Sequence, residues 1–164
     1  MTTGKDGIER FSVISSKPFE AVLAALEAAV GHPDMAEFFK ATDGARTLAE
    51  LESAVQRGLG RTGLMMFAKF DLGAILRKES GFDAPKIVRL LIGNPLVMKE
   101  MVKHVPDAGS YAPVTILLDE RPDGVHLSYD RMEGLLAPYG NSDALAVARD
   151  LDARIENLLQ ECST

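Results

Sequence analysis

The chain has 164 residues, of which 46% are apolar and 26% charged, a balance typical of one globular domain that needs no disulfide or metal for stability. Its net charge is −6, and it has no basic stripe with interleaved aromatic residues, which argues against nucleic-acid binding. No apolar run approaches the ~20 residues of a membrane span, and residues 1–7 lack the apolar segment of a secretory signal. We therefore expect a cytoplasmic protein with no nucleic-acid or membrane partner.

The first part of the chain predicts a strand and three helices. Residues 8–14 alternate in part, as expected for a strand. The helices are expected over residues 18–30, 34–41 and 47–57. Pro18 suits the first turn of the first helix, and Thr47 with Glu50 forms the capping-box pattern at the start of the third. The last two of these helices form a pair within residues 32–62.

The middle of the chain predicts two apolar strands, each followed by a helix. The strands are expected over 64–70 and 87–92, and the helices over 72–78 and 96–105. Asp71 stands between a strand and a helix, where it either caps the helix or serves as a general base. Arg89 is the one polar residue of the second strand, which we place centrally in the sheet. Asn94, followed by Pro95, either holds the turn into the next helix or faces a ligand at the sheet edge.

Residues 114–120 and 125–130 predict a β-hairpin across a turn that contains Asp123-Gly124. Alternation places Val125, Leu127 and Tyr129 on one face of the second strand, and His126, Ser128 and Asp130 on the other. The polar set either lies on a solvent-facing surface or lines a pocket, if that face of the sheet is uncovered.

A helix over 142–160 is expected to end the chain. Cys162 follows it, and we expect an exposed thiol without a role. Because the last two strands form a hairpin, a purely parallel sheet is not expected. The pattern favours an α+β fold, in which helices cover one face of a mainly antiparallel sheet of about five strands. We expect a single domain over 1–164.

Several short motifs follow one another in a characteristic order. They are Gly93-Asn94-Pro95, a helix carrying Met98 and Met101, Pro113, Asp123-Gly124 and Leu127-Ser128-Tyr129. In this order they resemble the domain of unknown function 302 family, over about residues 8–31 and 63–135. The resemblance implies a two-layer sandwich like that of the TATA-binding protein, and dimers, but no established biochemical role.

Relative to this family, residues 32–62 look like a helical insertion and residues 141–161 like a C-terminal helical extension. The chain also departs from the family at two positions. Many members carry a cysteine where this chain has Val114, and others carry a histidine where it has Leu72. A thiol-based or metal-based role in those relatives therefore cannot be transferred to this chain.

Metal and cofactor sites find little support in the sequence. The three histidines have no partner at metal-ligand spacing. Met98, Met101 and His104 step by three along a predicted helix, which either indicates a copper(I) site or, as we favour, core packing. The loop over residues 58–63 lacks the Gly-Lys-Ser/Thr ending of a phosphate loop. We expect neither a metal nor a cofactor.

Two hypotheses about function remain. The first is a non-catalytic binding or interaction protein that acts as a homodimer and holds a small apolar or amphipathic ligand between sheet and helices. Its support is the lack of a catalytic constellation, and the apolar residues of the 32–62 pair that need a partner surface: Met35, Phe38, Phe39, Leu48 and Leu51. The candidate ligand-binding residues are Asn94, Asp71, His126 and Tyr129.

The second hypothesis is a small enzyme that uses Asp71, His126 and Tyr129 as acid–base groups. Such groups must lie within hydrogen-bond reach of one another. His126 and Tyr129 are three residues apart on a strand and should face opposite sides, which counts against this hypothesis.

Overall fold

The computed structural model of the chain describes residues 8–81 and 85–164. Residues 1–7, where no secretory signal is expected, lie outside the described part. The strands are β1 (Arg10–Ser15), β2 (Met65–Asp71), β3 (Ile87–Gly93), β4 (Val114–Arg121) and β5 (Gly124–Asp130). The helices are α1 (Phe19–Ala29), α2 (Met35–Gly44), α3 (Leu48–Gly58), α4 (Leu72–Ser80), α5 (Pro95–Val102), α6 (Met132–Leu136) and α7 (Ser142–Ser163), with short 3-10 turns η1 (Pro106–Ser110) and η2 (Ala137–Tyr139).

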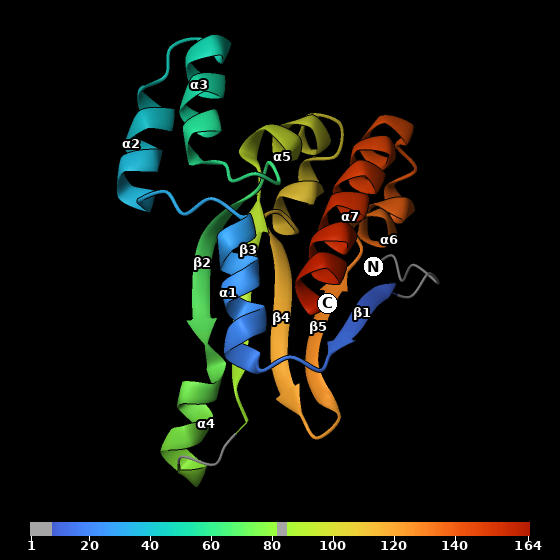
Figure 1. Cartoon of the computed structure of the whole chain (residues 1–164). Coiled ribbons are helices and arrows are strands. Elements are labelled where there is room, and N and C mark those ends of the chain that lie inside the picture. Colours follow the sequence, from blue (N-terminus) through green and yellow to red (C-terminus); the bar gives the residue numbers. More distant parts are fainter. Residues whose placement is uncertain (1–7, 82–84) are drawn as a thin grey trace.

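The five strands form one sheet in the order β1-β5-β4-β3-β2, and every neighbouring pair runs antiparallel (Figure 1). Strands β2 to β5 follow one another across the sheet, whereas β1 pairs with the outer side of β5. The expected α+β fold, with a mainly antiparallel sheet of about five strands, is confirmed.

The hairpin between β4 and β5 is tighter than the sequence predicts. Arg121 pairs with Gly124, so only Pro122 and Asp123 form the turn. Gly124 has a φ of +139°, and a Cβ atom there would lie 2.7 Å from the carbonyl oxygen of Ser15. Glycine is therefore required at this position both by the backbone angle and by the close approach of β1.

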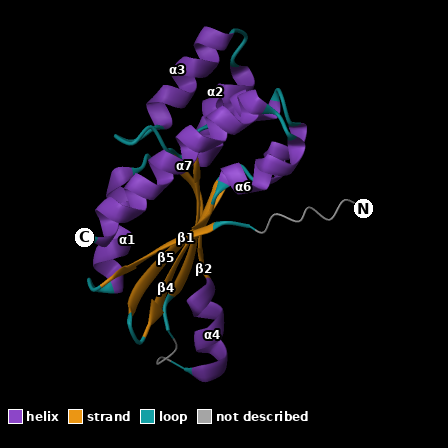
Figure 2. Ribbon diagram, turned by 90° about the vertical axis from the view of Figure 1, so that its right-hand side faces the viewer, coloured by secondary structure: helices purple, strands orange, loops and turns teal. Residues whose placement is uncertain are grey.

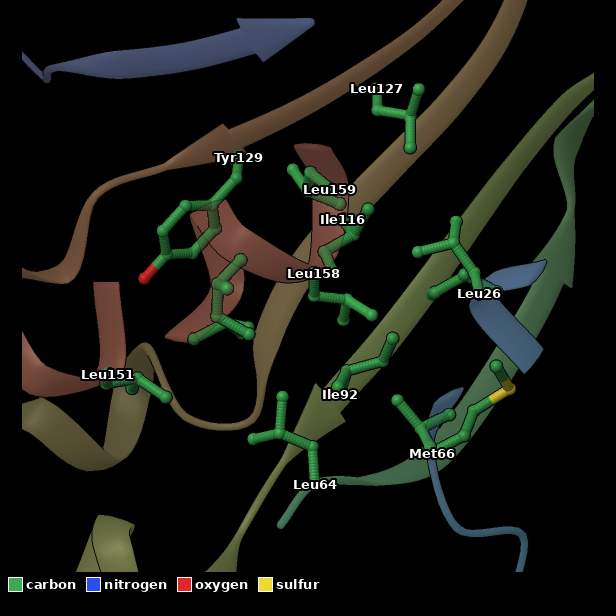
Figure 3. Close-up of a cluster of buried hydrophobic side chains, with 14 of the residues drawn as sticks. Leu26, Leu64, Met66, Ile92, Ile116, Leu127, Tyr129, Leu151, Leu158 and Leu159 are labelled. Carbon is green, nitrogen blue, oxygen red and sulfur yellow. The ribbon is translucent and has the colours of Figure 1, made fainter. Parts of the chain in front are cut away.

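Helices α1 and α7 cover one face of the sheet, where they contact each other and strands β1, β4 and β5 (Figure 2). The core between these layers is apolar. Figure 3 shows Ile92, Ile116 and Leu127 of the sheet together with Leu26 of α1 and Leu158 and Leu159 of α7, all of them buried. Burial of each such side chain contributes ~1.5–3 kcal/mol relative to exposure, so this layer contact is a main source of stability.

The opposite face of the sheet is called the open face below, because exposed residues of all five strands lie on it. Its residues are Arg10, Ser12 and Ile14 of β1, His126, Ser128 and Asp130 of β5, Thr115, Leu117 and Asp119 of β4, Ile87, Arg89 and Leu91 of β3, and Phe70 of β2. The expected division of β5 into an apolar and a polar face is confirmed: Val125, Leu127 and Tyr129 face the helices.

Helices α2 and α3 form the helical pair expected within residues 32–62, and they stand beyond one end of the sheet (Figure 1). The backbone segments that precede and follow this helical pair are hydrogen-bonded to each other. The amides of Gly31 and Gly60 both donate to the carbonyl oxygen of Leu64, at 2.9 Å each, and the amide of Met66 donates to the oxygen of Gly31 at 2.8 Å. A Cβ atom on Gly31 would overlap the carbonyl oxygen of Gly58, so a glycine is needed at this crossing.

Helix α7 is the longest described helix, but neither it nor any other helix of residues 8–81 and 85–164 has the length and apolar character needed to cross a membrane. It extends to Ser163, beyond the predicted end at residue 160. The expectation that Cys162 is exposed is therefore wrong. The extra helical turn places its thiol in the core, where the residue is 2% exposed.

Candidate functional site

Asp71 is the last residue of β2 and the N-cap of α4. Its Oδ1 accepts a hydrogen bond from the amide of Ala74 at 2.9 Å, and its Oδ2 accepts one from the Arg77 guanidinium at 2.8 Å. The Arg77 bond, followed by the Ala74 bond, lowers the pKa of Asp71. Both carboxylate oxygens therefore have structural partners, as expected for a helix cap.

Asn94 has a similar role at the start of α5. Its Oδ1 accepts from the amide of Leu96 at 2.9 Å, and its Nδ2 donates to the carbonyl oxygen of Gly63 at 3.0 Å. Pro95 occupies the first helical position. Asn94 therefore holds the α5 start against the loop before β2, and it also lies in the wall of a cavity described below.

His126 and Tyr129 lie on opposite faces of β5. His126 bonds Asp123 Oδ1 at 2.8 Å beside the hairpin turn, whereas the Tyr129 hydroxyl donates to the buried Asp152 at 2.6 Å. Burial, together with the Asp152 carboxylate, raises the pKa of Tyr129 above its ordinary value.

Asp71 is far from both of these residues. The strand register aligns it with Leu127 of β5, three strand spacings away, or ~14 Å. The structure therefore does not bring Asp71, His126 and Tyr129 together. They have no mutual hydrogen bond of the kind that acid–base catalysis requires.

A cavity of about 400 Å³, called the α2–α5 cavity below, lies between the helical pair and the end of the sheet. Its apolar lining consists mainly of Phe38 and Phe39 of α2, Leu51 of α3, Phe67 of β2, and Val97 and Met98 of α5. The Phe38 and Phe67 rings meet edge to face, with centroids 6.3 Å apart. Sequence reasoning predicts a partner surface for Phe38, Phe39 and Leu51, and this cavity is bounded by all three.

Polar groups also contribute to the wall of the α2–α5 cavity. Thr42 and Asp43 follow Phe38 and Phe39 by one helical turn, so α2 presents all four residues to it. Lys99 of α5 also lines the cavity, and its ammonium pairs with Glu100, which Lys103 contacts as well. The arrangement suits a molecule with an apolar body and a polar end.

A second pocket, of about 510 Å³, lies on the open face and is called the open-face pocket below. Its floor and walls include Arg10, Arg89, Leu91, Tyr111, Thr115, Leu117, Ser128, Asp130 and Leu135. Of the polar set expected on β5, Ser128 and Asp130 line this pocket, and His126 does not. Sequence reasoning missed Thr115, and it noted Arg89 only as a polar interruption of an apolar strand.

Metal binding by clustered side chains has no support in the described ranges. Within residues 8–81 and 85–164, no three His, Cys, Asp or Glu side chains come close enough to share an ion. Met101 is buried in the core, while Met98 lines the α2–α5 cavity.

Comparison with known proteins agrees with the resemblance found in the sequence. The family model described as "Domain of unknown function DUF302" matches residues 40–162. The fold is similar to that in the "Crystal structure of uncharacterized conserved protein DUF302 from Bacillus stearothermophilus", with a TM-score of 0.65, 14% identity, and coverage of 93% of this chain and 97% of that chain. No curated protein matches the chain. The chain therefore belongs to the DUF302 family, whose function is unknown.

Proposed function

We propose that this chain is a non-catalytic binding protein that holds a small apolar or amphipathic molecule in the α2–α5 cavity. The observation that carries the proposal is the cavity itself, whose volume of about 400 Å³ is bounded by mainly apolar side chains. Known ligand sites have volumes of ~300–1,000 Å³, apolar walls and a few polar groups that fix the orientation of the ligand.

The side chains of the cavity support a ligand with an aromatic or branched apolar body. Phe38 is buried, whereas Phe39 is 51% exposed, so the two rings give the cavity one fixed wall and one accessible wall. Phe39 meets Phe38 edge to face at 5.7 Å. A planar ligand can stack on such rings, while its polar end reaches Asp43 or Lys99.

Binding of the neutral apolar dye N-phenyl-1-naphthylamine tests this proposal. Its fluorescence should rise on saturable binding to the full chain. Phe39→Ala removes part of the accessible wall and should weaken binding several-fold. Met98→Glu places a carboxylate beside the apolar lining, and it should abolish the fluorescence change because an unpaired charge would have to be buried.

Leu48→Ala provides the matched control. Leu48 is an exposed apolar residue of the same helical pair, at 55% exposure, but it does not line the cavity. This variant should bind the dye as the native chain does. Equal dye affinity of the native chain, Phe39→Ala and Met98→Glu would show that the α2–α5 cavity is not the binding site.

The homodimer is part of the same proposal. Phe70, at the end of β2, and Ile75 and Leu76 of α4 are 45%, 71% and 40% exposed. Three large apolar side chains within seven residues support contact with a second copy at this edge of the sheet. Light scattering should give the mass of two chains for the native protein and of one chain for Ile75→Asp; a single-chain mass at all native concentrations would remove the dimer.

A cytoplasmic location completes the proposal. The chain has one cysteine, Cys162, and therefore cannot form an internal disulfide. Proteins without disulfides are common in the reducing cytoplasm. Fractionation of cells that express a tagged chain would test the location.

A further inference from the structure

We propose that the open-face pocket is a second binding site, specific for a small organic carboxylate that Arg89 holds. Residues 112–114 line both this site and the α2–α5 cavity, but Arg89, Thr115 and Ser128 line the open-face pocket and not the cavity. The occupant also differs in carrying a required negative charge. Three observations support it: the charge of Arg89, the Ser128 hydroxyl that lines the pocket without a hydrogen bond to another described residue, and the apolar floor of the pocket.

Arg89 differs from the other arginines of the open face. Arg10 forms two hydrogen bonds with Asp130, of 2.7 and 2.9 Å, and Arg121 likewise bonds both oxygens of Asp119. Arg89 has no carboxylate within 4.0 Å among the described residues. Its contacts are the Thr115 hydroxyl, at 3.3 Å, and the Phe70 ring, at 5.9 Å from the centroid.

The charge of the pocket indicates a monoanion. The negative charge of Asp130, which also lines the pocket, is compensated by Arg10, so one positive charge remains, on Arg89. A guanidinium matches a carboxylate in a planar, two-point contact, and Thr115 can donate a third hydrogen bond to the same group. A dianionic phosphate would leave one negative charge without a partner.

Ser128 indicates that the ligand has a second polar group. Although it lies on the uncovered side of the sheet, the residue is only 8% exposed, because the segments around Tyr111 and Leu135 flank the pocket. Its hydroxyl forms no hydrogen bond with another residue of the described ranges, and it lines the pocket. No fully buried side-chain polar atom of the described residues lacks a partner, so this hydroxyl is reachable from the pocket, where a bound molecule can form a hydrogen bond with it.

The strand register sets the spacing between these two contacts. Ser128 pairs with Leu117, and Leu117 pairs with Arg89, so the strands of Ser128 and Arg89 are two spacings, or ~10 Å, apart. Leu117 lies between them, and it forms an apolar floor together with Leu91, which follows Arg89 on the same face of β3. The ligand is therefore a carboxylate on a short, flat apolar body with a hydrogen-bonding group at its far end.

NMR titration of the full chain with 4-hydroxybenzoate, at low ionic strength, tests this inference. The amide shifts should be largest around Arg89, Thr115 and Ser128. Neutral 4-hydroxybenzamide has the same shape without the charge, and it should bind at least about tenfold more weakly, because it loses the ion pair with Arg89.

Variants separate the charge from the hydroxyl contact. Arg89→Gln should weaken 4-hydroxybenzoate binding about tenfold, while Arg61→Gln, which removes the same charge from an exposed pair with Glu161 outside the pocket, should have no effect. Ser128→Ala should weaken 4-hydroxybenzoate but not benzoate, which lacks the second group. The comparison of 4-hydroxybenzoate with benzoate on Ser128→Ala tests the site even if Arg89→Gln does not fold.

Three results would overturn the inference. They are an absence of shifts at millimolar ligand, equal binding of the acid and the amide, and shifts confined to the α2–α5 cavity. Because dye binding to that cavity is measured separately with Phe39→Ala, failure of either site is recognised without reference to the other.

Discussion

The Tyr129 hydroxyl donates a 2.6 Å hydrogen bond to Asp152 Oδ1, which joins the last strand of the sheet to α7. The same carboxylate accepts hydrogen bonds from the backbone amides of Met132, at 2.7 Å, and Glu133, at 3.0 Å, so it also fixes the start of α6. Asp152 is 1% exposed, and burial raises its pKa despite these hydrogen bonds. One buried acid thus holds three elements together, and one of them, α6, flanks the open-face pocket.

Removal of either partner of this bond should destabilise the chain, but to different extents. Tyr129→Phe leaves Asp152 with two donors and should lower the free energy of unfolding by ~1–2 kcal/mol. Asp152→Ala leaves the Tyr129 hydroxyl and the Glu133 amide without an acceptor, and it leaves the Met132 amide only the Tyr129 oxygen at 3.3 Å, so the loss should be at least ~3 kcal/mol. Urea unfolding measures both values. Asp150→Ala, an exposed change on the same helix, should stay within ~0.5 kcal/mol; equal losses for all three variants would contradict this role.

Asn94 should contribute to stability through its cap and through its loop contact. Asn94→Ala removes both hydrogen bonds, and we expect a loss of ~1–2 kcal/mol. Asn94→Asp keeps the oxygen that accepts from Leu96 but loses the donor to Gly63, so its loss should be smaller. Thermal unfolding of the two variants ranks them, and a larger loss for Asn94→Asp would show that repulsion between its carboxylate and the Gly63 carbonyl oxygen outweighs the retained cap.

The crossing at Gly31 should tolerate no side chain. Gly31→Ala forces the backbone away from Gly58, and we expect a loss of ~2 kcal/mol or more. Gly44→Ala is the matched control, because a Cβ atom there meets nothing within 4 Å, and it should be neutral or stabilising by up to ~1 kcal/mol. Chemical unfolding compares the two, and a mild effect at Gly31 would mean that the crossing adjusts easily.

Glu100 should make stability depend on pH in the acid range. Hydrogen bonds from Lys103 and then Lys99 lower its pKa from the ordinary 4.5 to about 2. Because the folded-state pKa is lowered, the stabilisation is present above pH 4.5 and is lost as the pH falls toward 2. The melting temperature of the native chain should therefore exceed that of Glu100→Gln at neutral pH and approach it near pH 2. The difference in melting temperature should also shrink at high salt, because these charges are exposed and salt screens them. A difference that does not depend on pH would contradict the lowered pKa of Glu100.

The helix caps and the faces of the hairpin could be predicted from the sequence because their signals are local. Asp71 directly precedes a helical pattern and Asn94 precedes Pro95, so both positions carry the chemistry of a helix start. Alternation along β5 likewise places Tyr129 and His126 on opposite faces.

The remaining features depend on contacts between distant segments. Asp152 interrupts the apolar face of α7, and only its packing against β5 and α6 shows that it is a buried acceptor. Burial of Cys162 depends on one further turn of helix. The open-face pocket combines Arg89, Thr115 and Ser128 from three strands, and their proximity follows from a register that no single segment encodes.

The joined backbone at Gly31 and Leu64 has a consequence for how members of such a fold can diverge. Because α2 and α3 leave the sheet layer and rejoin it at one point, the length of the pair can change while the pairing of the strands is kept. Selection can therefore change the wall that these two helices contribute to the α2–α5 cavity while the sheet and the other helices keep their arrangement.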